Sequence, residues 1–581
     1  MKSRAKAQKT IDEILKEHWG YDSFRPMQQD VIQSVMSGKD TLVLMPTGGG
    51  KSLTYQVPAL AMNGTTIVIT PLIALMNDQV YRLRQLGIKA LAIHSGLSPS
   101  SIINAIDLCQ FGDVKLLYVA PERLTSESFI RRVAGLKVSF IAVDEAHCIS
   151  QWGYDFRPSY LCIGEFRERF PDVPILALTA SATKRVCRDI MRRLNFKERK
   201  VMMGDFSRPN LSYVVRRCED KRGMLERLLT SVDGAAIVYS RTRAESEAVA
   251  QIVEEMGVSA TFYHGGLPYA ERNIRQDEWM RGEKRVICAT NAFGMGIDRS
   301  DVRLVVHYSM CASIEAYYQE AGRAGRDGER SYAVLLYSNN DMERIETIID
   351  KSFPTLDFIK ECYDKICASL MIGYGEGEGV NFPFNLREIC VREGWWSDSV
   401  LSVIKILSIC GYLSYDEQSE SPARVFFTVS RDDLYRVRIN RPDLEQIILL
   451  LLRNYEGIFS DFRVIDEEWL AQRGGYTTER IRELLALLWR SGVIRYIPSQ
   501  RTALLRMGSA RVPVRDLYIS PEVYKFRRDL YFKRFADMNC YTLNESRCRA
   551  RMLVEYFSVD SGEDCGICDI CIERRKAARG E

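Results

Sequence analysis

The stretch Met45-Pro-Thr47-Gly48-Gly49-Gly50-Lys51-Ser52 decides the fold of this chain. It follows the apolar run Thr41–Met45 and precedes a segment of helical character. Glycines let backbone N–H groups turn toward phosphate oxygens, and the amino end of a helix adds positive potential. A glycine-rich turn between a strand and a helix therefore predicts a phosphate-binding loop at the carboxyl edge of a parallel sheet.

Lys51 and Ser52 have separate predicted roles in this loop. We expect Lys51 to reach the β and γ phosphates of a nucleoside triphosphate, and Ser52 to ligate magnesium. The backbone N–H groups expected to face the phosphates belong to Thr47, Gly48, Gly49 and Gly50. The alternative is a glycine-rich turn with an incidental lysine.

An acidic pair follows a second apolar run, Phe140–Val143. We expect Asp144 to hold magnesium, Glu145 to orient and activate a water molecule, and His147 to couple the site to the rest of the chain. A solvated acidic pair on the surface is the alternative. The position of the pair at a strand end favours a site for triphosphate hydrolysis.

Two arginines in the segment 319–328 can complete such a site. Arg323 and Arg326 stand in a glycine-rich loop of a second α/β stretch, from which a guanidinium can reach across a cleft to the γ-phosphate. The alternative is a solvated Arg-Gly loop. We expect hydrolysis to fall by orders of magnitude without the arginine.

A third motif, Ser150–Pro158, is rich in aromatic residues and directly follows the acidic pair. Trp152 and Phe156 offer π faces on which bases can stack, and Arg157 offers a positive charge. A packed aromatic loop is the alternative. The motif predicts a sensor for single-stranded nucleic acid beside the triphosphate site.

Four of the sixteen cysteines stand apart from the rest near the end of the sequence. Three of them form two Cys-x-x-Cys spacings, and sixteen residues separate the fourth from these three. The four thiolates can converge on one tetrahedral ion, which favours a structural zinc site. An iron–sulfur cluster and four unbound thiols are the alternatives. The predicted ligands are Cys548, Cys565, Cys568 and Cys571.

Composition favours a soluble globular protein, with 46% hydrophobic and 27% charged residues. The net charge of +4 is too small for a polycation, so nucleic acid would bind through local patches. No apolar run approaches the ~18 residues that a membrane span needs, and the start lacks the apolar core of a signal peptide. Scattered cysteines in apolar runs indicate reduced thiols and a cytoplasmic location.

The fold class expected for residues 1–345 is α/β, with two open parallel sheets. Continuous apolar runs alternate with helical segments, which is typical of strands covered on both faces. The expected strands of residues 1–205 are Thr41–Met45, Thr66–Thr70, Lys115–Val119, Ser139–Val143 and Ile175–Leu178. Those of residues 206–345 are Ala236–Tyr239, Ala260–Tyr263, Arg285–Cys288, Leu304–His307 and Tyr332–Leu336.

The later part of the chain is mostly helical, with two expected winged-helix-like units at 346–435 and 436–518 and a helical cysteine-bearing subdomain at 519–581. In each unit two helices around a glycine turn precede a β-hairpin. The first hairpin is expected from Tyr412–Tyr415 and Arg424–Val429, and the second from Val493–Ile497 and Ala503–Met507.

These segments together resemble the RecQ family of DNA helicases, most closely over residues 15–345. The resemblance implies two RecA-like lobes that bind ATP between them. In it, Tyr21 stacks on adenine, and Arg25 and Gln28 hydrogen-bond the adenine or its phosphates. It also implies nucleotide contact by Asp298 in Ala289–Asp298. The DNA contacts that it implies, beside the aromatic loop, are Arg123, Ser240, Arg241 and Thr290.

The resemblance implies an ATP- and magnesium-dependent helicase that moves 3′ to 5′ on single-stranded DNA in recombination and repair. Its expected substrates are single-stranded and tailed or branched duplex DNA at the bacterial nucleoid, with a single-strand-binding protein as a candidate partner. The chain departs from the family in order, because residues 346–518 stand between the second lobe and the cysteines. An ATP-driven translocase or remodeller, a DNA-binding scaffold and an RNA helicase are therefore kept as alternatives.

Overall fold

The computed structural model describes residues 9–580 apart from 47, 95, 96, 98, 154, 295–298, 417–419, 422, 430–440, 456, 460, 461, 499, 502 and 558–562. The chain forms two compact units. Residues 1–346 and 527–581 make up the first unit, and residues 347–526 make up the second. No helix of the described residues is long and apolar enough to span a lipid bilayer.

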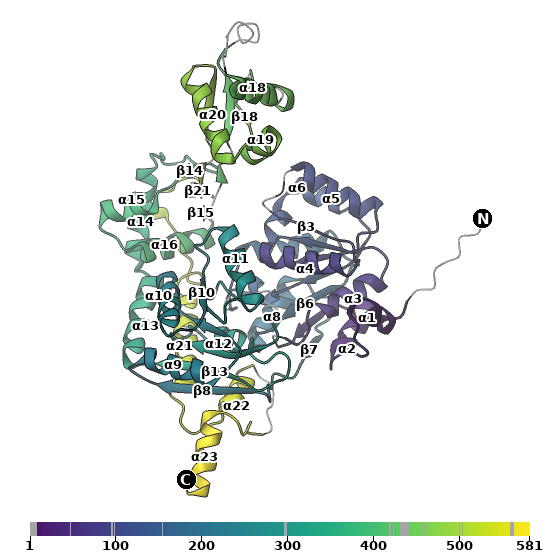
Figure 1. Ribbon diagram of the computed structural model, residues 1–581, viewed down its shortest axis with the longest axis vertical. Coiled ribbons are helices and arrows are strands. Elements are labelled where there is room, and N and C mark those ends of the chain that lie inside the picture. The colour runs from purple at the N-terminus through teal and green to yellow at the C-terminus, as the bar shows by residue number, and fades with distance from the viewer. Residues whose placement is uncertain are drawn as a thin grey trace, which may run out of the picture. The chain divides into compact units, whose positions relative to one another are not determined.

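The first lobe of the first unit is built on a seven-stranded parallel sheet of order β3-β4-β2-β5-β6-β1-β7 (Figure 1). All five expected strands are confirmed, while the short strands β3 and β7 were missed. The strands are β1 Thr41–Leu44, β2 Thr65–Ile69, β3 Ala90–Ile93, β4 Leu116–Val119, β5 Val138–Val143, β6 Ile175–Thr179 and β7 Val201–Met203.

Helices cover the sheet of the first lobe, and its central strands are completely buried. The phosphate loop lies between β1 and α3, as the sequence predicts. The helices are α1 Ile11–Trp19, α2 Gln28–Met36, α3 Leu53–Ala61, α4 Ile73–Gln85, α5 Pro99–Phe111, α6 Glu127–Val133, α7 Cys162–Glu168 and α8 Lys184–Arg193, with 3-10 turns η1 Pro121–Thr125, η2 Ala146–Ile149 and η3 Pro158–Leu161.

The second lobe has a six-stranded parallel sheet of order β10-β11-β9-β12-β13-β8. Its five expected strands are confirmed, and the edge strand β8 was missed because half of its residues are polar. The strands are β8 Leu211–Arg217, β9 Ala235–Tyr239, β10 Ala260–Tyr263, β11 Val286–Ala289, β12 Val302–His307 and β13 Ser331–Tyr337. The helices are α9 Lys221–Ser231, α10 Arg243–Glu255, α11 Tyr269–Met280, α12 Ile314–Ala321 and α13 Asn339–Ser352.

The C-terminal segment returns to the second lobe and covers its edge strand β8. It consists of α21 Lys525–Thr542, α22 Arg549–Tyr556 and α23 Asp569–Arg579. The aromatic ring of Phe557, directly after α22, stacks on Phe206 at 5.4 Å between ring centroids. This packing places the cysteine-bearing segment in the same compact unit as the two lobes, although it lies far from them in sequence.

The second unit contains two apolar cores, and its strand pairing corrects the sequence prediction. Strand β15 Leu413–Asp416 pairs with β21 Leu504–Met507, whereas β17 Arg424–Phe427 pairs with β19 Ile494–Ile497. Both expected hairpins are therefore wrong, because each exchanges a strand with the other. The buried side chains decide the pairing: Leu413, Leu505 and Met507 share one core, while Val425 and Ile494 belong to the other.

This exchange makes the second winged-helix-like core an insertion within the first. The helices expected in each core are confirmed, and a short antiparallel pair, β16 Glu420–Ser421 with β20 Gln500–Arg501, lies at the junction. The remaining elements are α14 Leu356–Ser369, β14 Asn381–Pro383, α15 Leu386–Glu393, α16 Ser397–Ile409, α18 Pro442–Asn454, β18 Arg463–Val464, α19 Glu467–Gly474, α20 Thr478–Arg490 and η4 Val514–Asp516. The predicted class of two parallel α/β lobes followed by winged helices and a cysteine-bearing segment is confirmed.

Candidate nucleotide and DNA site

A cavity of about 730 Å³ lies where the two lobes of the first unit face each other. The first lobe contributes the phosphate loop and the acidic pair, and the second contributes the two arginines of residues 319–328. Predicted site residues that line the cavity are Tyr21, Arg25, Gln28, Gly48, Gly50, Lys51, Ser52, Asp144, Glu145, Arg323 and Arg326. Groups more than 270 positions apart in sequence thus surround one space.

The segment before the first-lobe core contacts the phosphate loop directly. The Gln28 side-chain amide donates to the carbonyl oxygens of Gly49 and Gly50 at 3.2 and 3.1 Å, and the Arg25 guanidinium donates to that of Gly48 at 2.5 Å. Both residues line the cavity, and contact of Arg25 and Gln28 with adenine or its phosphates stays a prediction. Tyr21 is 54% exposed at the cavity, where an aromatic ring can receive a base.

A chain of charged and polar side chains runs from the phosphate loop into the first lobe. The Lys51 Nζ lies 3.7 Å from Glu145 Oε1, and Glu145 Oε2 lies 3.4 Å from His147 Nδ1. The same His147 nitrogen lies 2.9 Å from the hydroxyl of Thr179 at the end of β6. Glu145 adopts a left-handed backbone with φ of 47°, a conformation that costs a non-glycine residue about 1–3 kcal/mol and is concentrated at functional sites.

Burial and neighbouring charges shift the pKa values of Asp144 and Glu145 in opposite directions. Burial and the neighbouring charge of Glu145 raise the pKa of Asp144 to about 6. Burial also opposes ionisation of Glu145, but Lys51, His147 and Arg323 outweigh it and hold the pKa of Glu145 below its ordinary value. Burial lowers the pKa of His147, so this imidazole is neutral near pH 7. Glu145 is therefore an ionised carboxylate in contact with one ammonium group and one neutral imidazole.

The two arginines approach the cavity in different ways. Arg323 is 5% exposed and donates to the carbonyl oxygen of Gly294. The Arg326 side chain packs on Gly48 of the phosphate loop: a Cβ at Gly48 would lie 3.1 Å from Arg326 Cγ, and the φ of Gly48 is +81°. Arg326 thus touches the loop of the opposite lobe without a bound nucleotide.

Tyr160 is a site residue that the sequence reasoning missed. Its ring is fully buried, and its hydroxyl donates to the carbonyl oxygen of Asp144 at 3.0 Å. Because Tyr160 follows the aromatic loop, this hydrogen bond joins the end of that loop to the acidic pair. No motif signals it, since a lone tyrosine near an apolar run more often indicates core packing.

The aromatic loop itself lies against neighbouring side chains. The guanidinium of Arg185 stacks over the Trp152 ring at 3.2 Å, and that of Arg527 lies 5.6 Å from the centre of the Phe156 ring. Arg157 binds the Asp155 carboxylate at 3.0 Å and the Pro71 carbonyl oxygen at 3.0 Å. The aromatic faces that the sequence offers to bases are covered by arginines in this structure.

The other predicted DNA-contacting residues also make internal contacts. Arg123 donates to the His94 carbonyl oxygen at 2.9 Å, and Arg241 to the Met310 carbonyl oxygen at 2.9 Å. Ser240 and Thr290 are buried, each directly after a central strand of the second lobe. Thr47 and Asp298, both predicted to contact nucleotide, lie outside the described residues.

The four predicted zinc ligands converge on one point of the C-terminal segment. Their sulfur atoms all lie within 4.8 Å of one another, with Cys548 Sγ 3.4 Å from that of Cys565 and 3.9 Å from that of Cys568. Four thiolates at 2.3 Å from a tetrahedral ion would be separated by about 3.8 Å. Hydrogen bonds from Cys565 and Cys568 hold the pKa of the Cys548 thiol well below its ordinary value.

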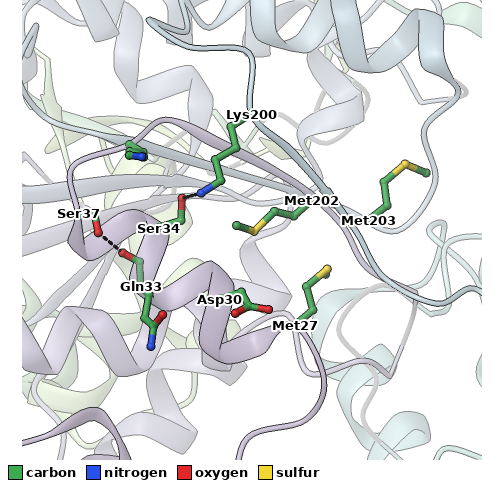
Figure 2. Close-up of a pocket in the computed structure, with 9 residues that line it drawn as sticks. Met27, Asp30, Gln33, Ser34, Ser37, Lys200, Met202 and Met203 are labelled. Atoms are coloured by element: carbon green, nitrogen blue, oxygen red, sulfur yellow. Dashed lines mark hydrogen bonds between the residues drawn. The ribbon is translucent and has the colours of Figure 1, made fainter.

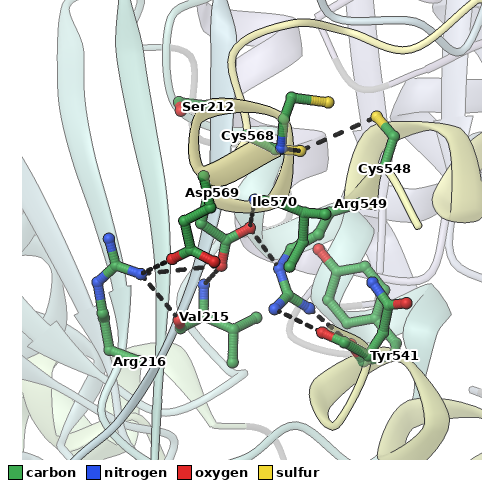
Figure 3. Close-up of polar contacts among 12 residues, drawn as sticks. Ser212, Val215, Arg216, Tyr541, Cys548, Arg549, Cys568, Asp569 and Ile570 are labelled. Carbon is green, nitrogen blue, oxygen red and sulfur yellow. Dashed lines mark hydrogen bonds and ion pairs between the residues drawn. The ribbon is translucent and has the colours of Figure 1, made fainter. Parts of the chain in front are cut away.

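Asp569 anchors this cysteine cluster to the second lobe (Figure 3). Its carboxylate is 2% exposed, accepts from the Val215 N–H of β8 at 2.9 Å and pairs with Arg549 Nε at 2.6 Å. The Ser212 hydroxyl donates to the Ile567 carbonyl oxygen at 2.5 Å. The edge of the second sheet is therefore covered by the turn that carries Cys568.

A second hollow of about 550 Å³ lies on the first lobe beside α2 and β7 (Figure 2). Lys200 reaches into it and donates to the Ser34 hydroxyl at 2.8 Å. None of the predicted site residues line this hollow. Its lining consists of polar, charged and methionine side chains. The predicted nucleotide-site residues that line a cavity are therefore those of the cavity between the lobes.

Three family models match separate parts of the chain. The "DEAD/DEAH box helicase" model matches residues 25–190, and the "Helicase conserved C-terminal domain" model matches residues 220–328. The "RecQ helicase winged-helix domain, Bacteroidota" model matches residues 425–498, which is the inserted core of the second unit. The two parallel lobes thus correspond to the two models of the DEAD/DEAH-box helicase class.

Curated relatives of the chain indicate one family within this class of helicases. The chain is 40% identical to "ATP-dependent DNA helicase RecQ" of Haemophilus influenzae, over 68% of this chain and 66% of that protein. It is 45% identical to the protein of the same name from Bacillus subtilis, over 58% of each. It is 37% identical to "Probable ATP-dependent DNA helicase RecS" of Bacillus subtilis, over 63% of this chain and 77% of that protein. The chain belongs to the RecQ family of helicases, as its motifs indicated.

The match spans slightly under two-thirds of the Haemophilus relative and just over half of the Bacillus protein named RecQ.

Replacing Asp569 with alanine should loosen the C-terminal segment from β8. The change leaves the Arg549 guanidinium buried without its carboxylate, a loss that typically costs about 3–5 kcal/mol. We expect faster hydrogen exchange of the β8 amides and a lower thermal midpoint. Glu573→Ala is the matched control, since Glu573 is mostly exposed and lies 3.9 Å from Arg216. Equal exchange rates in the two variants would contradict the anchoring role of Asp569.

Proposed function

We propose that this protein is an ATP-dependent DNA helicase of the RecQ type that moves 3′ to 5′ along single-stranded DNA. The observation that carries the proposal is the single cavity in which Lys51, Asp144 and Glu145 of one lobe face Arg323 and Arg326 of the other. A triphosphate in that cavity would be held by both lobes, so its hydrolysis would change their separation. Such a cycle can advance the lobes alternately along a phosphate backbone.

Each charged side chain of the cavity has its own proposed role in ATP hydrolysis. Glu145 stays ionised at neutral pH, so it can accept a proton from an attacking water molecule. Lys51 and the two arginines carry positive charge, which can offset the charge that develops on the γ-phosphate. His147 connects Glu145 to β6 and is proposed to hold the carboxylate in position.

Asp144 and Ser52 fit a magnesium ion. The Asp144 carboxylate is partly buried and its pKa is raised to about 6, so a nearby cation would stabilise its ionised form. The Ser52 hydroxyl lines the cavity and makes no capping hydrogen bond to α3. When bound, magnesium would neutralise charge on the phosphate oxygens. We propose that Asp144 and Ser52 hold it.

Single-stranded, tailed and branched duplex DNA are the proposed substrates. Bases would stack on Trp152 and Phe156 after the arginines that cover them move aside, and Arg123 and Arg241 would meet phosphates. From the resemblance to the RecQ family we also propose a nucleoid location and a single-strand-binding protein as partner. The strand-displacement experiment distinguishes DNA unwinding from RNA unwinding.

The cysteine cluster is proposed to hold structural zinc. All four donors are sulfur atoms, three of the side chains are buried, and the spacing of the sulfur atoms suits a tetrahedral ion of this size. Zinc would supply a cross-link between the residues before α22 and the start of α23. Through Asp569, the cross-linked turn would brace β8.

Strand displacement tests the proposed function. The protein should separate a duplex with a 3′ single-stranded tail when ATP and magnesium are present, and should leave a 5′-tailed duplex paired. Lys51→Ala should lower ATP turnover by about two to three orders of magnitude while the fold is kept, because a charge on the γ-phosphate is lost. ATP turnover without strand displacement would favour a translocase or remodeller instead. Preference for RNA would contradict the DNA assignment.

Metal content tests the zinc proposal. The purified protein should contain one zinc ion per chain, and Cys568→Ser should lower zinc content and thermal stability together, because metal binding is coupled to folding. Cys540→Ser is the matched control, since Cys540 is an exposed cysteine of the same segment. The zinc proposal would be contradicted if Cys568→Ser kept the thermal stability of the parent and neither protein contained metal.

A further inference from the structure

Helix α21 contacts the aromatic loop, an arrangement that no motif predicts. The Arg534 guanidinium donates to the carbonyl oxygen of Trp152, and the Arg527 guanidinium lies over the Phe156 ring. Arg527 is partly buried, and burial together with the nearby charge of Arg534 lowers its pKa. Arg527 and Arg534 are seven residues apart, so their side chains lie on the same face of α21. Both contact the aromatic loop, which is proposed to sense DNA.

The same helix contacts the second lobe. Arg534 Nε lies 3.5 Å from the Glu315 carboxylate, and their side chains are 13% and 6% exposed. The Tyr556 hydroxyl donates to the same Glu315 oxygen at 3.0 Å. Two turns further along α21, the ring of Tyr541 packs on Tyr317 at 5.2 Å between centroids. Glu315 and Tyr317 both belong to α12.

Helix α12 leads directly to the nucleotide cavity. Its residue Gln319 lines the cavity, and the helix ends at Ala321, two positions before Arg323. A displacement of Glu315 along this short helix would therefore be passed to the arginine pair. Arg534 makes polar contacts with both Trp152 and Glu315.

We propose that Arg534 is a positioning residue that couples the aromatic loop to the arginine pair. It links the backbone of Trp152 in the first lobe to Glu315 at the start of α12 in the second lobe. This inference rests on the proposed function, because it assigns a route by which bound DNA changes ATP turnover. When bases occupy the aromatic loop, movement of the Trp152 backbone shifts Arg534, and with it the helix that precedes Arg323 and Arg326.

The geometry favours a two-way link over simple packing. A planar guanidinium can donate in two directions at once, toward a carbonyl oxygen on one side and a carboxylate on the other. The first-lobe end of the aromatic loop already contacts the acidic pair through Tyr160. Arg534 gives the loop a second connection, to the opposite wall of the same cavity, so DNA at the loop can act on both walls together.

The inference is tested by ATP turnover of the full chain, measured with and without a single-stranded oligonucleotide. Arg534→Gln should leave turnover without DNA within about twofold of the parent, while the DNA-stimulated increase falls roughly tenfold, which is typical of a lost coupling. Glu315→Gln should reduce the stimulation in the same way, because it removes the other end of the link. Zinc content and thermal midpoint are measured in parallel.

Lys533→Gln is the matched control. Lys533 is exposed on the same helix and its replacement removes the same charge, so any general weakening of DNA attraction appears in both variants. Full stimulation in Arg534→Gln, or equal loss in Lys533→Gln, would overturn the inference. If the parent protein itself shows no stimulation by DNA, the proposed function fails instead, so the two failures are distinct.

Discussion

The first unit depends on an electrostatic constraint in the cavity between its lobes. Three cationic side chains, Lys51, Arg323 and Arg326, face two carboxylates across a largely buried space. Bringing so many charges out of water is costly unless a ligand of opposite charge is present. A triphosphate with a divalent cation would satisfy these groups, and because they come from both lobes, it would also draw the lobes together. In the proposed function, the need to satisfy buried charge links ATP hydrolysis to lobe movement.

The C-terminal segment extends this link to the proposed DNA site. Residues 527–581 pack with the two lobes, although residues 347–526 separate them in sequence. The second unit accommodates its own insertion in the same way, since the paired strands β15 and β21 close the first winged-helix core around the second. Within the second unit, the inserted segment leaves after β15 and returns at its partner strand β21, so the packing of the host core is kept.

The sequence predicted the two lobes well because buried parallel strands are continuous apolar runs, such as Phe140–Val143. It also predicted which residues meet in the cavity, because Lys51, Asp144 and Glu145 all follow strand ends that share one edge of a sheet. It failed for the winged-helix hairpins, where Leu505 and Val425 carry the same local pattern and only the three-dimensional core distinguishes them. It could not find Tyr160 or Arg534, whose importance lies in contacts with backbone carbonyl oxygens that leave no sequence pattern.

The most direct measurement of the central claim compares nucleotide binding with hydrolysis in Arg326→Ala. If a guanidinium of the second lobe acts on a triphosphate held by the first, this variant should bind ATP with nearly the affinity of the parent, as measured with a fluorescent ATP analogue. Its DNA-stimulated turnover should fall about 10³-fold, as for the loss of an arginine that stabilises a phosphoryl transition state. Turnover equal to that of the parent would contradict the account, because hydrolysis would then need only one lobe.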